Sequence, residues 1–354
     1  MAEVLLTGFP GFIARRLFQK LVEAGDNVSL LVRHRYQAEG NALIARTQGP
    51  GSGRVLVGDV ALMDLGLTGP EVRNLLREVE VVYHTATVQT REGRPQDAWT
   101  VNVDGTRSVV ELALGADRLT RFAFLSSAFV SGDRRGVVLE EELERSQAFR
   151  TQFERAKFEA EKILRRVAAD MPVSVFRPSL IVGDSQTGEF DQTDDPYHMM
   201  LRFLNVPFNI NVPLPGRGDY PLNIVPVDYV VSAMSHITRD PRGVGRTFHL
   251  TDPNPLPARR VLELLAEHGN RRRPWGTIPA PLARRLLKLP IINRLGPPPR
   301  VVDHFNRLVI YNNTNTLELL GGTELQCPPF ESYVSNLVAH LQRMGGDSRE
   351  NRYA

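Results

Sequence analysis

The 354-residue sequence predicts an α/β fold with a doubly wound parallel sheet and a smaller C-terminal lobe. Two observations predict it. Short apolar runs alternate with longer amphipathic segments as far as residue 178, and the first apolar run ends in a glycine turn that opens a helix. Such alternation is typical of βαβ units, in which each helix returns the chain to a parallel strand. After residue 183 the alternation loosens, which favours a separate lobe.

The first strand and its turn occupy residues 4–17, where Gly8, Gly11 and Ala14 recur at three-residue intervals. Glycine lets the chain turn sharply, and its missing Cβ lets backbone N–H groups approach a pyrophosphate. The helix N-terminus adds unpaired N–H donors and a positive dipole end. The spacing differs from Gly-x-Gly-x-x-Gly, so alone it also fits an ordinary tight turn in an α/β protein.

The other elements of the sheet follow in regular order. We expect helix 12–24 to lead by a right-handed crossover to strand 27–33. A polar, glycine-rich stretch precedes strand 54–60, and Thr68 is a suitable N-cap for helix 69–78. Further strands are expected at 79–87, 121–127 and 173–178, and further helices at 102–114 and 150–168.

The predicted boundaries divide the chain into two parts. Residues 1–183 and 221–252 form the nucleotide-binding domain, because the apolar run at 223–230 and the helix after it return to the sheet. Residues 184–220 and 253–354 form the substrate-binding lobe over the strand ends, where ligands of such sheets bind. The apolar residues between Phe203 and Ile210 fit a lipophilic ligand and an ordinary core equally well.

Composition argues against several classes of protein. The net charge is +3, and no basic motif is interleaved with aromatic residues, so we expect no nucleic-acid partner. The single cysteine excludes an internal disulfide and a thiolate zinc site, which fits a reducing cytoplasm. No apolar run reaches the roughly 18 residues of a membrane span. The chain enters a strand at Glu3, so we expect no signal segment and a cytoplasmic protein.

Two further segments have alternative interpretations. Segment 281–300 combines apolar residues with arginine and lysine, which fits peripheral contact with a membrane, the rim of an apolar substrate mouth, or a surface helix packed on its own core. The acidic stretch with Asp191, Asp194, Asp195 and His198 matches no standard spacing of metal ligands. We therefore expect a solvated loop there and no metal.

Several short motifs occur together and in order. They are Thr7-Gly8-x-x-Gly11-x-x-Ala14, Gly58-Asp59-Val60, His84-x-Ala86, Asn102-Val103-x-Gly105-Thr106, Leu125-Ser126-Ser127, Lys157 and Arg177-Pro178. Over residues 4–250 this set resembles the extended short-chain dehydrogenase/reductase family. The ending Leu31-Val32-Arg33 and the stretch Leu65-Gly66-Leu67 make the chain most similar to the branch of thioester reductases and fatty-acyl reductases. The resemblance implies a Rossmann-type domain that binds a nicotinamide dinucleotide.

Arg33 bears on the choice of cofactor. It ends the second strand, where an acid would bind the ribose hydroxyls of NAD(H) and an arginine suits the 2′-phosphate of NADP(H). We favour NADP(H) and keep NAD(H) as the alternative, in which Arg33 is a solvated strand end. The resemblance implies cofactor contacts from Thr7, Gly8, Phe9, Pro10, Gly11, Phe12, Ile13, Arg33, Asp59, Val60, Thr85, Ala86, Thr87, Lys157, Pro178 and Ser179.

In this family a serine steadies the substrate carbonyl, and a tyrosine four residues before a lysine transfers the proton. Residues four apart share a helix face, so the ammonium lowers the pKa of the phenol. By position, Ser127 matches the serine, Lys157 the lysine, and Asn102 the asparagine that supports a relay water. Phe153 occupies the tyrosine position and has no ionisable proton. The expected substrate contacts are Val88, Ser127, Ala128 and Tyr197.

The missing tyrosine leaves three functions open. The first is reduction of a ketone, aldehyde or acyl thioester in a hydrophobic or carrier-linked substrate, with a proton from water held by Ser127 and Lys157 or from Tyr197. The second is a dinucleotide-binding sensor or scaffold without redox turnover. The third is a redox-neutral dehydratase or epimerase. A homodimer fits all three. We expect His84 to serve strand packing, and Asp228 to tie a helix start to the substrate loop.

Overall fold

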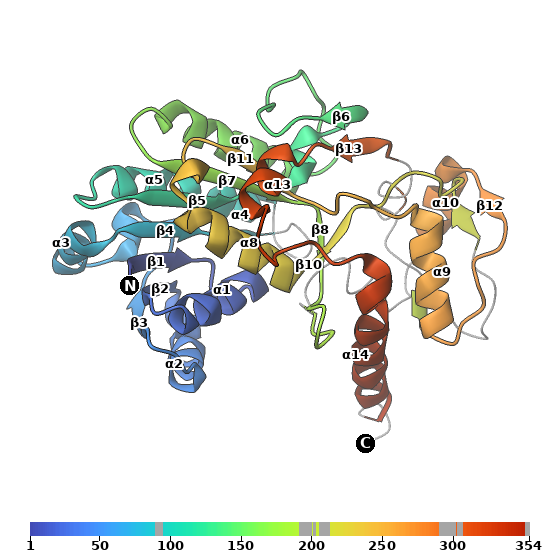
Figure 1. The fold of residues 1–354 in the computed structure, drawn as a ribbon, viewed down its shortest axis with the longest axis horizontal. Helices are drawn as coiled ribbons and strands as arrows, with labels where there is room; N and C mark the ends of the chain where they lie inside the picture. The colour runs from blue at the N-terminus through green and yellow to red at the C-terminus, as the bar shows by residue number, and fades with distance from the viewer. Residues whose placement is uncertain are drawn as a thin grey trace.

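A computed structural model describes residues 1–88, 95–190, 200, 203–204, 213–289, 302 and 307–350. Its centre is a seven-stranded parallel sheet in the order β11-β7-β5-β4-β1-β2-β3 (Figure 1). The order reverses between β1 and β4, which is the switch point of a doubly wound sheet. The predicted fold class is confirmed. The strands are β1 Glu3–Thr7, β2 Asn27–Val32, β3 Ser52–Val57, β4 Val81–His84, β5 Arg121–Leu125, β7 Val173–Pro178 and β11 Thr247–Leu250.

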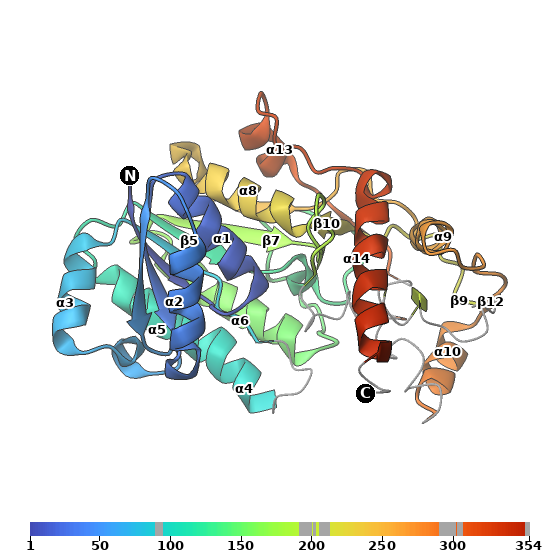
Figure 2. The same cartoon turned by 90° about the horizontal axis from the view of Figure 1, so that it is seen from below.

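Helices cover both faces of this sheet, so its central strands are buried on both sides. Every residue of β5 and β7 is buried. Figure 2 shows α8 and α13 on one side of β7 and α6 on the other. One face packs against α1 Phe12–Glu23, α2 Gln37–Arg46, α8 Val227–Arg239 and α13 Thr314–Leu320. The other packs against α3 Gly69–Glu78, α5 Gly105–Leu114 and α6 Gln152–Val167.

The order of elements along the chain agrees closely with the prediction, and the strand ends differ. Two expected strands, 54–60 and 79–87, end earlier because their last residues bond outside the ladder. Asp59 N–H donates to Leu65 O at 2.8 Å, and Thr85 Oγ1 donates to Thr7 O at 2.6 Å. Thr68 is the N-cap of α3, as predicted, and Glu71 accepts from its backbone N–H at 2.8 Å.

A second apolar cluster lies beyond the carboxyl ends of the strands. It contains α9 Ala258–His268, α14 Phe330–Glu350 and the paired strands β8 Leu180–Val182 and β10 Ile224–Pro226. Phe203 and Leu204 are part of this core, which is the second of the two roles considered for this stretch; its other apolar residues, up to Ile210, lie outside the described residues. The outer elements are β9 Leu214–Pro215, β12 Thr277–Ile278 and α10 Ala280–Leu287.

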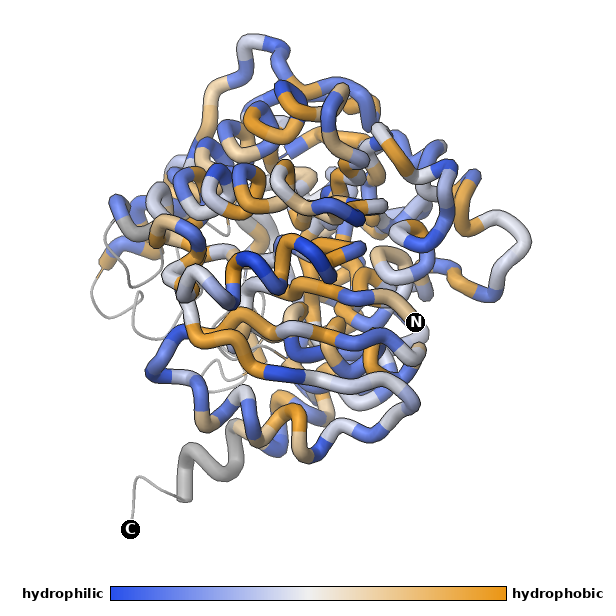
Figure 3. Tube along the Cα trace, turned by 90° about the vertical axis from the view of Figure 1, so that its left-hand side faces the viewer, coloured by the Kyte–Doolittle hydropathy of each residue, from blue (hydrophilic) through white to orange (hydrophobic). Residues whose placement is uncertain are grey.

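The C-terminal part of the chain also returns to the sheet. Strand β13 Val309–Tyr311 pairs with β6 Gly136–Val138, and α13 packs beside α8 and β11 (Figure 1). The predicted division into domains stays a prediction; residues 309–320, assigned to the lobe from the sequence, contact the sheet domain. Figure 3 shows apolar stretches gathered in the central strands and hydrophilic stretches over the outer helices. Among the residues described, no helix has the length and apolar character needed to cross a bilayer.

Candidate active site

The glycine turn lies at the switch point of the sheet and passes close to the residues that follow β4. Gly8 has φ +107°, and a Cβ there would lie 2.5 Å from Thr85 Oγ1 and 2.8 Å from Ala86 N. Gly11 is the N-cap of α1, where no side chain caps the first turn. Backbone N–H groups at a helix N-terminus are therefore left for an anionic ligand. The residues present fit a dinucleotide diphosphate.

The other expected cofactor residues border this turn or the neighbouring strand ends. Phe9, Phe12, Val60, Thr85 and Ala86 are buried, whereas Thr87 is exposed. Pro10 and Ile13 are half-buried in the same turn. Pro178 ends β7 and Ser179 follows it, with the Ser179 hydroxyl donating to Asn223 Oδ1 at 2.6 Å. All of these positions lie at the carboxyl edge of the sheet.

Arg33 and Asp59 meet beside the ends of β2 and β3. Arg33 Nε lies 3.4 Å from Asp59 Oδ2, and the two side chains are 35% and 28% exposed. An ion pair that is open to solvent in this way contributes little to stability. Its components therefore remain accessible to a nucleotide, and the guanidinium is the group in this pair suited to a phosphate.

His84 is part of a buried chain of hydrogen bonds between β1 and α5. Thr106 Oγ1 donates to Asn102 O at 2.7 Å, so His84 Nε2, 3.0 Å away, is the donor to Thr106. His84 Nδ1 then accepts from Thr7 Oγ1 at 2.8 Å. Burial, together with the charge of Lys157, lowers the pKa of His84 to about 3. The neutral ring has both nitrogens occupied, which confirms the structural role expected for it.

Asn102 lies in a π-helical turn, Thr100–Asp104, that precedes α5. Its side-chain Oδ1 accepts from Val88 N at 2.8 Å, and its Nδ2 donates to Val88 O at 2.9 Å. The amide thus fixes the backbone of Val88, one of the expected substrate contacts, after β4. Single π-helical turns occur often at functional sites. The water-relay role of Asn102 stays a prediction.

Lys157 is fully buried on α6 beneath the end of β5. Its Nζ donates to Leu125 O at 2.8 Å and lies 5.2 Å from the centre of the Phe124 ring. Removal from water lowers the pKa of the Lys157 ammonium to about 7. Leu125 is two residues before Ser127, so lysine and serine approach the same strand end. An amine with this pKa can exchange a proton near neutral pH.

Ser127 and Ala128 begin a short 3-10 turn after β5. Ser127 Oγ accepts from Phe129 N at 3.2 Å, an arrangement that leaves the hydroxyl proton available to a ligand. Phe153 is half-buried in the first turn of α6, four residues before Lys157, and so shares its helix face. Tyr197, Asp191, Asp194, Asp195 and His198 lie outside the described residues.

Sequence reasoning gave no role to Glu161, which holds this region together. Its Oε2 accepts from Ser126 Oγ at 2.7 Å and from Arg177 Nε at 3.0 Å, and all three side chains are buried. One carboxylate therefore joins α6, the end of β5 and the end of β7. Glu161 follows Lys157 by four residues on a predicted helix, so the sequence alone could have placed both side chains on one helix face. Arg177 is the cation of this buried ion pair.

The Arg177 guanidinium continues into the C-terminal segment. It donates to Glu140 O at 3.0 Å and to His249 Nε2 at 3.3 Å, and His249 Nδ1 donates to Asn312 O at 2.6 Å. The Glu140 carboxylate accepts from His249 N at 2.8 Å. It also accepts from Thr316 Oγ1 at 3.0 Å. Burial raises the pKa of Glu140, and burial lowers the pKa of His249 to about 3.

Asp228 connects the start of α8 to the loop after β8. Its Oδ1 accepts from Ser185 N at 2.8 Å and its Oδ2 from Ser185 Oγ at 2.7 Å. This is the tie between a helix start and the substrate loop that the sequence predicted. Within the described ranges, no group of three His, Cys, Asp or Glu side chains is arranged to hold a metal ion.

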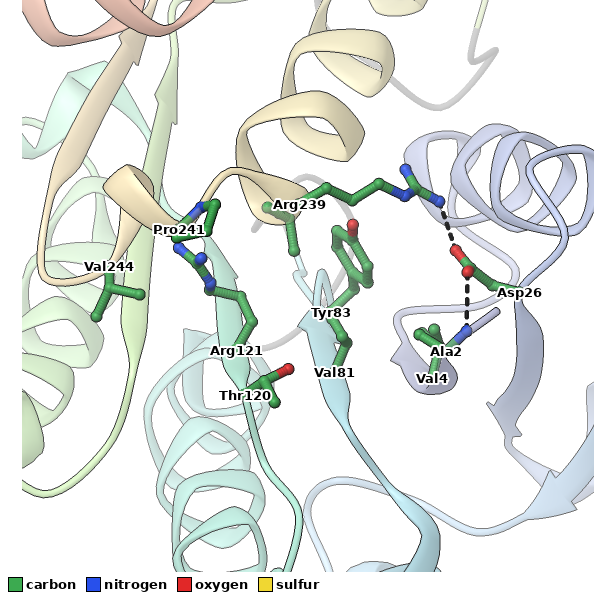
Figure 4. A pocket seen from close by; sticks show the side chains of 11 residues that line it. Ala2, Val4, Asp26, Val81, Tyr83, Thr120, Arg121, Arg239, Pro241 and Val244 are labelled. Atoms are coloured by element: carbon green, nitrogen blue, oxygen red, sulfur yellow. Dashed lines mark hydrogen bonds and ion pairs between the residues drawn. The ribbon is translucent and has the colours of Figure 1, made fainter.

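A cavity of about 350 Å³ lies at the opposite edge of the sheet, away from the glycine turn. Figure 4 shows Tyr83 in it, with Arg121 and Arg239 extending to either side. Arg121 donates to Ser174 Oγ at 2.9 Å and to Asp240 O at 2.9 Å, and Arg239 pairs with Asp26. These contacts tie the end of α8 to the amino ends of the strands, so we assign the cavity no catalytic role.

Comparison with known proteins agrees with this geometry. Residues 6–234 match the NAD-binding family model described as "Male sterility protein". One of the proteins that make up the linear gramicidin synthase of Brevibacillus parabrevis is 27% identical over 266 residues, which are 71% of this chain and 5% of that protein. Fatty acyl-CoA reductase wat of Drosophila melanogaster is 22% identical over 275 residues, 65% of this chain and 53% of that protein. The chain thus spans about half or less of the length of these relatives.

Solved structures share the fold. The terminal R domain from the myxalamid PKS-NRPS biosynthetic pathway superposes with a TM-score of 0.82 at 24% identity, covering 98% of this chain and 91% of that one. The family model covers well over half of the chain, in the region that carries the glycine turn, Ser127 and Lys157. The chain therefore belongs to the male sterility protein family, and it is an extended short-chain dehydrogenase/reductase with thioester-reductase-like and fatty-acyl-reductase-like relatives.

Proposed function

We propose that this protein is an NADP(H)-preferring reductase that acts on a carbonyl of a hydrophobic or carrier-linked substrate. One observation carries the proposal: the Gly8 turn before the uncapped start of α1, which we interpret as a phosphate cradle, lies at the same edge of the sheet as the fully buried Lys157. The names of two relatives, a linear gramicidin synthase and a fatty acyl-CoA reductase, support a substrate held through an acyl group. Arg33 supports the preference for a 2′-phosphate.

A nicotinamide dinucleotide bound at this cradle would supply the hydride. The chain's own residues then have two tasks. The Ser127 hydroxyl donates a hydrogen bond to the substrate oxygen, because its lone pair already accepts from Phe129 N. Asn102 holds the loop at Val88 that borders the substrate. Both groups are positioned by hydrogen bonds within the chain before any ligand arrives, as electrostatic stabilisation of a developing oxyanion requires.

We assign proton donation to Lys157, because Phe153 cannot donate. The ammonium of Lys157 has its pKa lowered to about 7, so it releases a proton far more readily than an ordinary lysine. An intervening water would carry that proton to the substrate oxygen, and the neutral amine would regain a proton from solvent. General acid catalysis contributes about 10²–10⁴-fold, so a less direct donor is still compatible with turnover of an activated carbonyl.

The test measures loss of reduced nicotinamide absorbance by stopped-flow with NADPH and with NADH, over ketones, aldehydes and acyl thioesters. We expect oxidation of NADPH with at least one class, and a much slower rate in Ser127→Ala. Isothermal calorimetry with each dinucleotide accompanies it. Tight binding without oxidation across the panel would contradict the proposal and favour a sensor or scaffold. Turnover of a hydroxylated substrate with no net oxidation would favour a dehydratase or epimerase.

A further inference from the structure

The segment between Glu267 and Asp303 contains basic residues and no acidic residue. Its described part carries six positive charges, whereas the whole chain has a net charge of only +3. Positive charge is therefore concentrated in this one region. Arg273 pairs with Glu267 at 3.0 Å at the edge of the segment. The six basic residues are Arg271, Arg272, Arg273, Arg284, Arg285 and Lys288.

Large apolar side chains are exposed on the same segment. Trp275 is 77% exposed, Leu282 46%, Leu286 37% and Leu289 49%. Leu282 and Leu286 are one turn apart on α10, so they share a face. Helix α10 packs inward through Ala283, which is 2% exposed, and so leaves its leucines outside. We call these four apolar residues and the five exposed basic residues, Arg272, Arg273, Arg284, Arg285 and Lys288, the basic-apolar face.

The basic-apolar face lies at one end of the molecule. Figures 1 and 2 both place α10 and β12 at the end opposite α3 and beyond the sheet. The nucleotide-binding domain therefore does not obstruct contact between this face and an extended surface. Of the three roles considered for segment 281–300, packing on its own core holds for the inward side of α10, and residues 290–300 lie outside the described residues.

We propose that the basic-apolar face docks on the surface of a bilayer that contains anionic lipid. Arginine and lysine attract anionic headgroups, and an amphipathic face buries its apolar side chains at the boundary between headgroups and acyl chains. An indole prefers that interfacial depth, which suits Trp275. Exposed leucines beside concentrated positive charge match this chemistry. The proposal concerns where the protein binds and does not depend on its catalytic function.

The experiment is co-sedimentation of the full chain with phosphatidylcholine vesicles, with and without phosphatidylglycerol. We expect binding to the anionic vesicles that weakens as salt is added, since screening shortens the reach of surface charge. The double variant Arg285→Glu/Lys288→Glu should bind them about tenfold or more weakly. Leu282→Gln/Leu286→Gln should also lose binding. The matched controls, Met63→Gln and Arg77→Glu near α3, should bind like wild type.

A second readout identifies the contact itself. Emission from Trp275 should shift to the blue on addition of anionic vesicles, and Trp275→Phe should abolish that shift. The proposal is overturned if wild type fails to sediment, or if the charge-reversal variant binds as the controls do. Binding of an acidic carrier domain through this face, without vesicle binding, would also overturn it. So would a raised KM in Leu282→Gln/Leu286→Gln with unchanged vesicle binding. Circular dichroism and urea denaturation verify that each variant is folded, whether or not it binds a nucleotide.

Discussion

Replacement of Lys157 by methionine tests whether its ammonium is buried at a cost to stability. Removal from water lowers the pKa of this lysine from 10.5 to about 7. The native state therefore binds fewer protons than the unfolded state between these pH values, so wild-type stability rises with pH across that window. At about 1.4 kcal/mol per pKa unit the full change is about 5 kcal/mol. Methionine does not titrate, so Lys157→Met lacks this rise.

The assay is urea denaturation of the protein without added ligand, at about pH 6 and about pH 10 and at constant ionic strength. The stability of Lys157→Met relative to wild type should fall by several kcal/mol between the two. The lost hydrogen bond to Leu125 O destabilises the variant at both pH values, so the test uses the change of the stability difference with pH and not its value at one pH. Lys162→Met, which removes a surface pair with Glu144 and Glu159, is the control on the same helix. If the stability difference between Lys157→Met and wild type did not change with pH, the lowered pKa of Lys157 would be refuted, and with it the assignment of Lys157 as the proton donor.

Four further predictions follow from the site. Phe153→Tyr should speed carbonyl reduction by about 10²-fold in single turnovers, because it restores a direct acid; an unchanged rate would indicate that protonation does not limit. Gly8→Ala should abolish dinucleotide binding in calorimetry while circular dichroism stays native, because the added Cβ would lie 2.5 Å from Thr85 Oγ1 and the turn would have to shift. Unchanged affinity would contradict the assignment of this turn as a phosphate cradle. Arg33→Ala should weaken NADPH about tenfold more than NADH, and equal losses would exclude a 2′-phosphate contact. Glu161→Gln should lower the free energy of unfolding in urea by about 3–5 kcal/mol by leaving Arg177 unpaired. The double variant with Arg177→Met should recover part of that loss, and no recovery would mean that the pair itself is not the cause.

The sequence predicts the sheet and the elements of the site well where the signal is local. Helices α1, α3 and α6 are marked by apolar periodicity, and the Gly8 turn by its spacing. Strand β11 was missed because Thr247–Leu250 is only four residues long and its burial depends on packing against β7. The ends of β3 and β4 were placed too late, because the hydrogen bonds that end these strands come from distant residues.

The residues of the candidate site also differ in how well the sequence predicts them. The family resemblance assigns Ser127, Asn102 and Lys157 by motif position, and the structure brings Lys157 to the strand end that precedes Ser127. The partners of Glu161 come from β5 and β7, and no local pattern shows that its carboxylate joins Ser126 to Arg177. The low pKa of Lys157 likewise depends on how deeply α6 packs, which periodicity alone does not specify. The contribution of Tyr197 stays a prediction.

The polar cluster around Arg177 has a consequence for how this protein tolerates cleavage and recombination. Asn312 and Thr316 belong to a segment more than sixty residues after the last strand of the sheet. Asn312 O accepts a hydrogen bond from His249, and Thr316 Oγ1 donates one to Glu140. Proteolysis that released this segment would admit water beside an ion pair only one helical turn from Lys157. If evolution replaced the distal lobe by another, residues 309–320 would therefore have to be kept. Otherwise the new lobe would have to supply hydrogen-bonding groups for Glu140 and His249 in place of Thr316 and Asn312.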